Sequence, residues 1–411
     1  MQITKRYFLY LLFYTIATLL SFTKFGFLAK ALSVEGFGQY SLVMILYVYI
    51  IYVGGFGSGE YVLKLTSQKY HNNQCCNNNF EIAVIYGVLG VSCVGIFCIL
   101  IGWLFFDEYL DIIMLVALLS CCAIFYNIIE AYNRGKQAVL VFSSMLLTKS
   151  MMVLLLMYFM VDEYQLLGAF LSECLSFVLV AAAYSVPYFR RRNSKFGGLV
   201  KQELQQIIKH GFHVNLSNAI KNFSTSLDRY SVGLIWGVYG LGVYSFLMIP
   251  YQGMILASSM LFGILGPKIV TLLVNNDGKV LFNKWIYKVI AFFLIVGSLT
   301  APIFGYFATF LVDKFYPDYA IMETGYILSI IYFSAIIVAA ISFFDWYFIG
   351  ISKEKFVSIS STVSVSVMVL AFPYFYYFDG EIHQFASVIM ISRFASLLVC
   401  ILVYRREYIH S

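Results

Sequence analysis

Polar and charged side chains recur at steps of three and four along one hydrophobic segment, residues 212–236. They are Asn215, Asn218, Lys221, Asn222, Thr225, Asp228 and Arg229. With 3.6 residues per turn, these positions fall on one face of a helix. The segment is long enough to cross a bilayer, where a charge near the centre costs about 2.5–3.5 kcal/mol. Such residues normally face a water-filled cavity or a paired partner, so the stripe predicts a substrate path.

Further charged residues lie deep inside other hydrophobic segments. The bases are Lys24, Lys149, Lys221, Arg229 and Arg393, and the deeply placed acids are Glu173 and Asp228. Five bases against two acids predict a cationic cavity. Such a cavity suits a phosphate or diphosphate, because ammonium and guanidinium groups both bind anionic oxygens. The five bases are therefore candidate substrate ligands, and Lys221 and Arg229 are the best of them.

The two acids also allow a structural interpretation. Ion pairs of Asp228 with Lys24 and of Glu173 with Arg393 would hold two halves of the protein in one state, although they would leave the excess positive charge unexplained. Asp228 and Glu173 are therefore candidate coupling or lobe-bridging acids. Lys149 has an alternative of its own, because the serines and threonine around it are also typical of a locally hydrated helix.

Three more acids lie near the ends of hydrophobic segments that we place on the cytoplasmic side. Glu60, Glu130 and Asp345 are candidate gate residues. Long side chains near a helix end reach the membrane interface, so gate or loop contacts explain these acids. Protonation coupling by one of them is the alternative.

The composition places the chain among membrane proteins. It is 61% hydrophobic and only 12% charged over 411 residues, whereas an ordinary soluble domain is about 45–50% apolar. Segments of about 20 apolar residues, enough to span a bilayer core of about 30 Å, recur throughout. We predict an all-α polytopic membrane protein with twelve transmembrane helices, at 7–31, 37–62, 81–105, 110–132, 139–161, 165–189, 212–236, 238–266, 284–311, 321–345, 356–377 and 383–404.

Basic residues gather at alternate ends of these segments. Clusters such as Lys5 with Arg6, residues 190–192 and Arg405 with Arg406 all fall at one set of ends, and most connections at the other set are acidic. By the positive-inside rule the basic set is cytoplasmic. The alternation continues through all twelve segments and predicts that both termini are cytoplasmic. The net charge of +6 therefore reflects topology, and no nucleic-acid partner is expected.

Two copies of a six-helix unit follow each other in the chain. The stretch 36–42 (GFGQYSL) reappears as 240–246 (GLGVYSF), an offset of about 204 residues. The same offset places Lys24 opposite Asp228. Farther on, Glu173 in the sixth segment matches Arg393 in the twelfth. Each match is weak alone, but together they indicate a duplication.

Each copy has an even number of crossings, so both enter from the cytoplasm as a parallel repeat about an axis along the membrane normal. We expect an N-terminal six-helix lobe at 1–189, a basic cytoplasmic linker at 190–211 and a C-terminal six-helix lobe at 212–411. Substrate sites in transporters with internal repeats lie between the repeats, near the midplane. The basic linker either contacts anionic lipid headgroups or acts only as a topology determinant.

The cysteines and the N-terminus add little to this interpretation. The eight cysteines lie in apolar segments or in the predicted cytoplasmic loop at Cys75 and Cys76, where thiols stay reduced. Their spacing is not that of a zinc site, so neither a metal nor a cofactor is expected. Lys5, Arg6 and the following apolar run also resemble a secretory signal, but the repeat needs this helix as the partner of the seventh.

The first helix with Lys24, the stretch Ala29-Lys30-Ala31-Leu32-Ser33-Val34-Glu35-Gly36-Phe37-Gly38-Gln39-Tyr40 and the six-plus-six layout carry a family resemblance. The chain resembles the O-antigen flippase (Wzx-type) branch of the polysaccharide transporter family, in the MOP (MATE-like) exporter superfamily. The motif is short, and it also occurs in capsule and teichuronic exporters. The topological likeness covers nearly the whole chain.

This resemblance implies movement of an undecaprenyl-diphosphate-linked oligosaccharide from the cytoplasmic to the periplasmic leaflet of the bacterial inner membrane, during O-antigen and lipopolysaccharide biosynthesis. Alternating access, with coupling to a proton or sodium gradient, is the implied mechanism. Membrane lipids, a polysaccharide polymerase and chain-length proteins are the implied partners. The positions of the family's cavity charges correspond to Lys24, Lys221, Asp228, Arg229 and Arg393.

Other classes fit the residues less well. A multidrug or cation antiporter of the same superfamily would need an acidic cavity. A membrane polysaccharide polymerase or ligase would need a periplasmic catalytic platform, whereas every predicted outward connection is short and no Walker, serine-elbow or HExxH motif occurs. The lipid II flippase branch has fourteen helices, and a channel would carry repeated subunit motifs. No catalytic residue is therefore expected.

Overall fold

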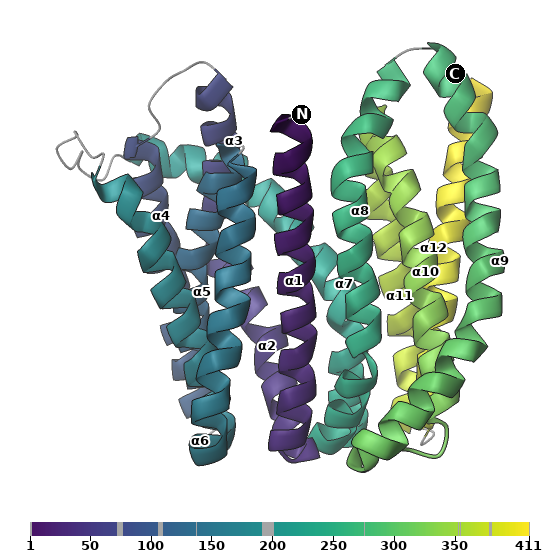
Figure 1. Ribbon diagram of the computed structural model, residues 1–411, viewed down its shortest axis with the longest axis horizontal. Helices are drawn as coiled ribbons and strands as arrows, with labels where there is room; N and C mark the ends of the chain where they lie inside the picture. The colour runs from purple at the N-terminus through teal and green to yellow at the C-terminus, as the bar shows by residue number, and fades with distance from the viewer. Residues whose placement is uncertain are drawn as a thin grey trace. The chain divides into compact units, whose positions relative to one another are not determined.

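The computed structural model describes the backbone of residues 2–71, 77–105, 110–136, 138–190, 201–274, 276–351, 353, 355–377 and 380–410. Nearly all of these residues are helical (Figure 1). The helices are α1 Gln2–Ala31, α2 Val34–Gly54, α3 Ser58–His71, α4 Asn77–Phe105, α5 Leu110–Gly135, α6 Val139–Arg190, α7 Lys201–Leu247, α8 Ile249–Val274, α9 Asn276–Phe315, α10 Thr324–Gly350, α11 Lys355–Tyr377 and α12 Ile382–His410, with a 3₁₀ turn η2 at Pro317–Tyr319.

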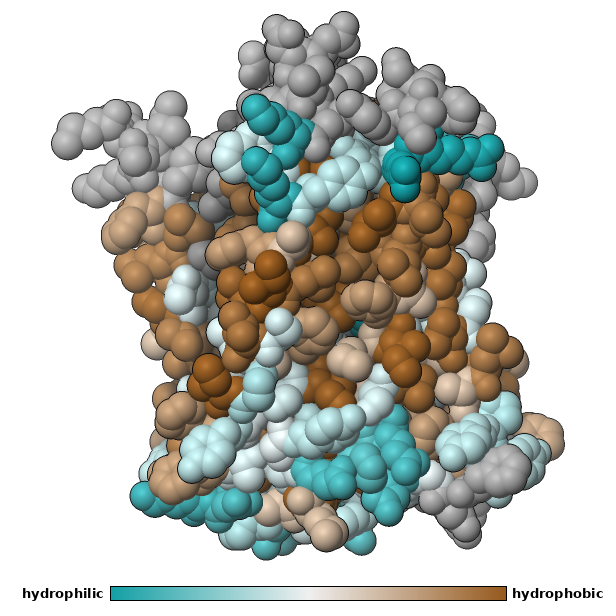
Figure 2. Space-filling view, turned by 90° about the vertical axis from the view of Figure 1, so that its right-hand side faces the viewer, coloured by the Kyte–Doolittle hydropathy of each residue, from teal (hydrophilic) through white to brown (hydrophobic). Residues whose placement is uncertain are grey.

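Most of these helices have the length and the apolar composition of membrane-spanning helices. Ten of them contain a described stretch that is long and apolar enough to cross a membrane. Many of their large apolar side chains are exposed: in α9, for example, these include Phe292, Leu299 and Phe310. Figure 2 shows one face of the molecule, on which hydrophobic residues form a broad band between hydrophilic ends. Because a helix satisfies its own backbone hydrogen bonds, this pattern identifies a multi-pass membrane protein.

The helix α6 is a hairpin of two antiparallel crossings. Its backbone leaves the helical conformation at Gln165, where φ is 47°. The hydroxyl of Tyr184 donates to Ser144 Oγ at 3.0 Å, although the two residues are 40 positions apart. In a straight helix they would be about 60 Å apart. The predicted fifth and sixth segments, separated at residues 161–165, therefore correspond to the two arms of α6.

The helix α7 reverses in the same way at Gly237. The φ angle there is 68°, in the left-handed region that glycine adopts at little cost. The Tyr244 hydroxyl reaches back across this turn to Asp228, 16 positions earlier. The predicted eighth segment is consequently formed by residues 238–247 and α8, with a break at Met248 before the proline at position 250.

The second predicted segment, 37–62, is divided in the structure. The helix α2 ends at Gly54, and α3 begins at Ser58 after a turn in which Phe56 and Gly57 have positive φ angles. A single helix was expected here, and the glycine-rich turn explains the difference because it breaks the helical hydrogen-bond ladder. With the α6 and α7 hairpins resolved, the described helices supply twelve crossings, as the sequence predicts.

The chain divides into two compact units, Met1–Ile220 and Lys221–Ser411, each of which we describe by itself. In unit 1, α6 packs against α1 and α5, and α4 against α5. In unit 2, the central helix α10 packs against α8, α9 and α12 through buried residues such as Ile337 and Phe344. Of the linker predicted at 190–211, residues 191–200 lie outside the described residues and 201–211 belong to α7.

The close approach of α2 to α4 provides a test of this packing. A Cβ atom at Gly90 would lie 2.2 Å from the carbonyl oxygen of Gly54, so we expect Gly90→Ala to lower the free energy of unfolding by about 1–3 kcal/mol. The matched control is Gly59→Ala in α3, because a Cβ there meets no atom within 4 Å. Thermal unfolding of the purified variants measures both. Equal melting temperatures would contradict the backbone contact.

Candidate functional site

Glu173 is the centre of a buried polar cluster in unit 1. Its side chain, in the second arm of α6, is 1% exposed. The Lys24 ammonium on α1 donates to Glu173 Oε1 at 2.7 Å, and the Tyr40 hydroxyl on α2 donates to the same oxygen at 2.8 Å. A carboxylate buried within a membrane protein needs such partners, since an isolated charge there is costly. Three helices are therefore joined at one side chain.

Local sequence explains how α1 and α2 present these partners. The connection from α1 to α2 is only two residues long, and Ser33 caps α2 by accepting a hydrogen bond from the Gly36 amide at 3.0 Å. This tight reversal brings the first turns of α2 beside the last turns of α1. The ring of Tyr40 then stacks on Phe170 of α6, with 5.5 Å between ring centroids.

Lys149, on the first arm of α6, extends this cluster. Its ammonium lies 3.8 Å from the ring centroid of Phe177 and 5.3 Å from that of Tyr126, both within cation–π range. It also interacts electrostatically with Glu173. The two bases and one acid leave unit 1 with one excess positive charge in this cluster. The role of Lys149 as a substrate ligand stays a prediction.

The corresponding cluster in unit 2 is centred on Asp228. This side chain is 1% exposed, and the buried Tyr244 hydroxyl donates to its Oδ2 at 3.0 Å. The other oxygen, Oδ1, is buried and has no hydrogen-bond partner among the described residues. The neighbouring Arg229 likewise has a buried Nε without a hydrogen-bond partner in the described part of the chain. Among the described residues, both groups therefore keep an unused hydrogen-bonding atom.

Arg393 lies on α12, where it contacts α11. Its Nη1 donates to Ser364 Oγ at 2.9 Å, and the side chain is only 6% exposed. Ser364 in turn donates to Ser392 at 3.3 Å. The guanidinium is thus held by a small hydroxyl network inside unit 2.

The repeat relates the two clusters and reverses their charges. Both copies keep a fully buried tyrosine on the second helix that donates to a carboxylate, Tyr40 in unit 1 and Tyr244 in unit 2. The first helix carries a base in unit 1 and the acid Asp228 in unit 2. The sixth helix of each copy carries Glu173 and Arg393, respectively. The two units therefore share the contact between a tyrosine and a carboxylate, but the acid lies on the sixth helix in unit 1 and on the first helix in unit 2.

The observed pairing differs from the one considered from the sequence. That interpretation joined Lys24 to Asp228 and Glu173 to Arg393, whereas Lys24 and Glu173 pair with each other inside unit 1. The reason is the packing of α1 on α6, which places the two side chains face to face. Sequence reasoning also missed the two tyrosines as polar partners, although the repeated GxGxYS motif contains both of them.

The remaining predicted site residues lie nearer the helix ends, and Glu130 interacts electrostatically with Lys149. Glu130 pairs with Arg134 one helical turn later, at 3.5 Å, and the Arg134 side chain is 53% exposed. Glu60 lies in the first turn of α3 and Asp345 near the end of α10, both partly buried. The side chains of Asn215, Asn218, Lys221 and Thr225 lie outside the described residues.

Comparison with known protein families assigns the chain to a family. A family model described as polysaccharide biosynthesis protein matches residues 3–267, more than half of the chain. The chain belongs to this family. The resemblance to polysaccharide transporters seen in the sequence is thereby confirmed for this member of the polysaccharide biosynthesis family. Sequence comparison with curated proteins found no match.

Solved structures of the MOP superfamily share the fold of this polysaccharide biosynthesis family member. An inward-facing multidrug resistance MATE transporter is 12% identical, with a TM-score of 0.69 over 96% of this chain and 94% of the other. A MATE transporter variant from Vibrio cholerae is 12% identical, with a TM-score of 0.67 over 100% and 97%. A MOP transporter from Pyrococcus furiosus, described as having a binding pocket of reverse polarity, is 14% identical, with a TM-score of 0.62 over 97% and 94%. The predicted fold class is confirmed.

The ion pair in unit 1 generates a prediction about stability. Glu173→Gln would leave the Lys24 ammonium without its carboxylate, so we expect a loss of about 3–5 kcal/mol in the free energy of unfolding. Reversing both charges, with Lys24→Glu and Glu173→Lys, should restore part of that loss. The measurement is thermal unfolding of protein purified from membranes.

The control is Arg134→Gln, which breaks the partly exposed pair with Glu130 near a helix end and should cost less, about 1 kcal/mol. The loss of stability in the double reversal should be smaller than the summed losses of the two single variants. If it equals that sum, direct attraction between Lys24 and Glu173 is not the source of stability.

Proposed function

We propose that this protein is a flippase that moves an undecaprenyl-diphosphate-linked oligosaccharide, such as an O-antigen repeat unit, across the bacterial inner membrane. The cargo enters from the cytoplasmic leaflet and leaves in the periplasmic leaflet by alternating access. Both termini are cytoplasmic, as the distribution of basic residues favours. No cofactor takes part, and the protein acts beside a polysaccharide polymerase and chain-length proteins.

The observation that carries this proposal is the excess of bases among the membrane-buried charges of a polysaccharide biosynthesis family member. Lys24, Lys149, Arg229 and Arg393 lie in described helices, against the acids Glu173 and Asp228. Of these, Arg229 keeps a buried N–H group without a hydrogen-bond partner among the described residues. A diphosphate supplies the anionic oxygens that such groups bind. The central cavity inferred from the sequence stays a prediction.

The positive sign of the excess buried charge also favours this proposal over export of cationic drugs. The multidrug MATE transporters share the fold, but a cationic drug would be repelled by an excess of buried bases. The Pyrococcus furiosus transporter, whose reverse pocket polarity is described as suggesting a different function, supports the idea that one framework carries different cargoes. We therefore favour an anionic headgroup over a cationic drug.

The two buried acids have different roles in this proposal. Glu173 is held by Lys24 and Tyr40, so its protonation would break an ion pair, and we assign it to positioning Lys24. Asp228 has one oxygen with no hydrogen-bond partner among the described residues and is not part of an ion pair there. It can take up a proton without losing such a pair. We therefore assign coupling to a proton gradient to Asp228.

A deletion strain provides the test of the cargo. Without the protein, lipid-linked oligosaccharide should accumulate on the cytoplasmic face of the inner membrane and surface polysaccharide should disappear. The measurement is the accessibility of the labelled oligosaccharide to a membrane-impermeant enzyme in vesicles of each orientation. Accumulation of unpolymerised units on the periplasmic face would instead indicate a polymerase.

Complementation of the same strain tests the basic residues. We expect Arg229→Ala to reduce surface polysaccharide by about tenfold, because it removes a charged hydrogen-bond donor from the substrate path. Arg405→Ala, which removes an exposed arginine near the end of α12, is the matched control and should complement fully. Full complementation by Arg229→Ala at equal membrane abundance would contradict the assignment.

The coupling role of Asp228 gives a separate prediction. Asp228→Asn imitates the protonated acid, so translocation in proteoliposomes should no longer respond to an imposed proton gradient. Asp162→Asn, at an exposed acid in the α6 hairpin turn, should keep the full response. The readout is translocation of a fluorescent lipid-linked oligosaccharide with and without the gradient. An unchanged response in Asp228→Asn would remove Asp228 from the coupling mechanism.

A further inference from the structure

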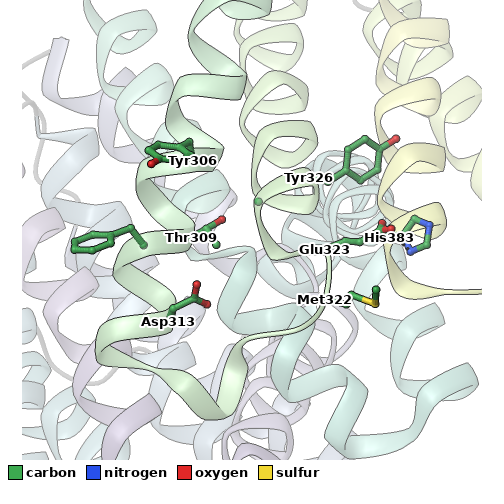
Figure 3. Close-up of a pocket in the computed structure, with 9 residues that line it drawn as sticks. Tyr306, Thr309, Asp313, Met322, Glu323, Tyr326 and His383 are labelled. Carbon is green, nitrogen blue, oxygen red and sulfur yellow. Dashed lines mark ion pairs between the residues drawn. The ribbon is translucent and has the colours of Figure 1, made fainter.

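A separate pocket lies in unit 2, at the end that the charge distribution assigns to the outer face. It has a volume of about 810 Å³ and is formed by the last turns of α9 and the first turns of α10 and α12. Figure 3 shows Tyr306, Thr309 and Asp313 following one another along α9, with Glu323 and His383 close together across from them. None of these residues takes part in the buried clusters described above.

Aromatic side chains form much of the pocket wall and continue onto the lipid-facing surface. Tyr306, Phe310 and Tyr326 line the pocket, and all three are exposed. The adjoining face of α9 carries the exposed residues Ile303 and Phe307. Tyrosine and other aromatic residues gather at the depth of lipid headgroups in membrane proteins. The pocket therefore opens where a phospholipid headgroup would lie.

The polar part of the pocket is acidic. Asp313 and Glu323 are both exposed carboxylates. His383 bridges Glu323 and Glu381, with its Nδ1 3.1 Å and 3.0 Å from their carboxylate oxygens. Even with His383 protonated, the two carboxylates that line the pocket, Asp313 and Glu323, outnumber it. A site of this charge repels phosphate and attracts a cation.

The nearest base on α9, Lys314, makes cation–π contacts. The Lys314 ammonium lies 5.7 Å from the ring centroid of Phe310 and 5.5 Å from that of Phe315. Lys314 does not line the pocket as the structure describes it. The negative charge of the pocket is therefore available to a ligand.

We propose that this pocket binds a primary ammonium group, and that its source is the ethanolamine headgroup of a phospholipid in the outer leaflet. An ammonium group has three N–H donors for the carboxylates of Asp313 and Glu323, and its charge is attracted to the faces of Tyr306 and Tyr326. The lipid phosphate would lie at the rim, away from the acids. This site is independent of the cargo proposed above.

Helix packing keeps the pocket in shape. A Cβ atom at Gly305 would lie 2.4 Å from the carbonyl oxygen of Gly325, so α9 and α10 approach closely beside the pocket. Gly325 is itself part of the lining. Tyr326 on the next position of α10 is oriented by its hydroxyl, which lies 3.3 Å from Ser387 Oγ on α12. The aromatic and acidic groups are thus mounted on packed helices.

Lipid binding to the purified full chain tests the proposal. Native mass spectrometry would compare short-chain phosphatidylethanolamine, phosphatidylcholine and phosphatidylglycerol. We expect phosphatidylethanolamine to bind about tenfold more tightly than the other two, because only its headgroup donates N–H groups to carboxylates. Equal binding of phosphatidylglycerol would overturn the proposal.

Variants localise the binding to the pocket. Asp313→Asn and Glu323→Gln should each weaken phosphatidylethanolamine binding by about tenfold. Asp318→Asn is the matched control, because Asp318 is an exposed acid of the same connection that does not line the pocket. Unchanged melting temperatures would show that the variants fold. Unchanged lipid binding in both pocket variants would overturn the site.

Two soluble probes test whether the ammonium group that binds belongs to a lipid or to an amino sugar. Glucosamine presents a primary ammonium group without a lipid, and glucose is its neutral counterpart. We expect both to bind more weakly than phosphatidylethanolamine. Tighter binding of glucosamine than of the lipid would overturn the headgroup assignment and would place an amino sugar in the pocket instead.

Discussion

The cost of an unpartnered charge in a bilayer governs the arrangement of this protein. A helix hides its own backbone from lipid, but a buried carboxylate or ammonium group still requires partners from other helices. In unit 1, Glu173 receives both the Lys24 ammonium and the Tyr40 hydroxyl on one oxygen. The packing of α1, α2 and α6 is consequently fixed at one point in the membrane, and the neighbouring Lys149 is left as excess positive charge.

The second unit uses the same framework differently. Its tyrosine again donates to a carboxylate, but that carboxylate belongs to the helix equivalent to α1, and the base Arg393 on α12 takes the position that Glu173 has in unit 1. One oxygen of Asp228 is buried with no hydrogen-bond partner among the described residues. The repeat has therefore kept the contact between a tyrosine and a carboxylate while placing the acid on a different helix in each unit.

The two proposed binding sites carry charges of opposite sign. Membrane-buried bases favour an anionic headgroup, whereas the pocket among α9, α10 and α12 is acidic and aromatic. A single ligand with one kind of charge would not suit both sites. This contrast is the reason to assign the diphosphate of a lipid-linked oligosaccharide to one and an ammonium group to the other.

The sequence by itself determined the class, the twelve crossings and the repeat, because apolar length and the alternation of basic residues are local properties of the chain. It also located the charged residues, since a lysine or glutamate inside an apolar segment is visible without coordinates. Only the tertiary structure decided that Lys24 pairs with Glu173 and that Tyr40 and Tyr244 serve as hydroxyl donors. These contacts depend on which helix faces lie together. Lys24 and Tyr40 lie 149 and 133 positions from Glu173, and neither spacing nor composition records those contacts.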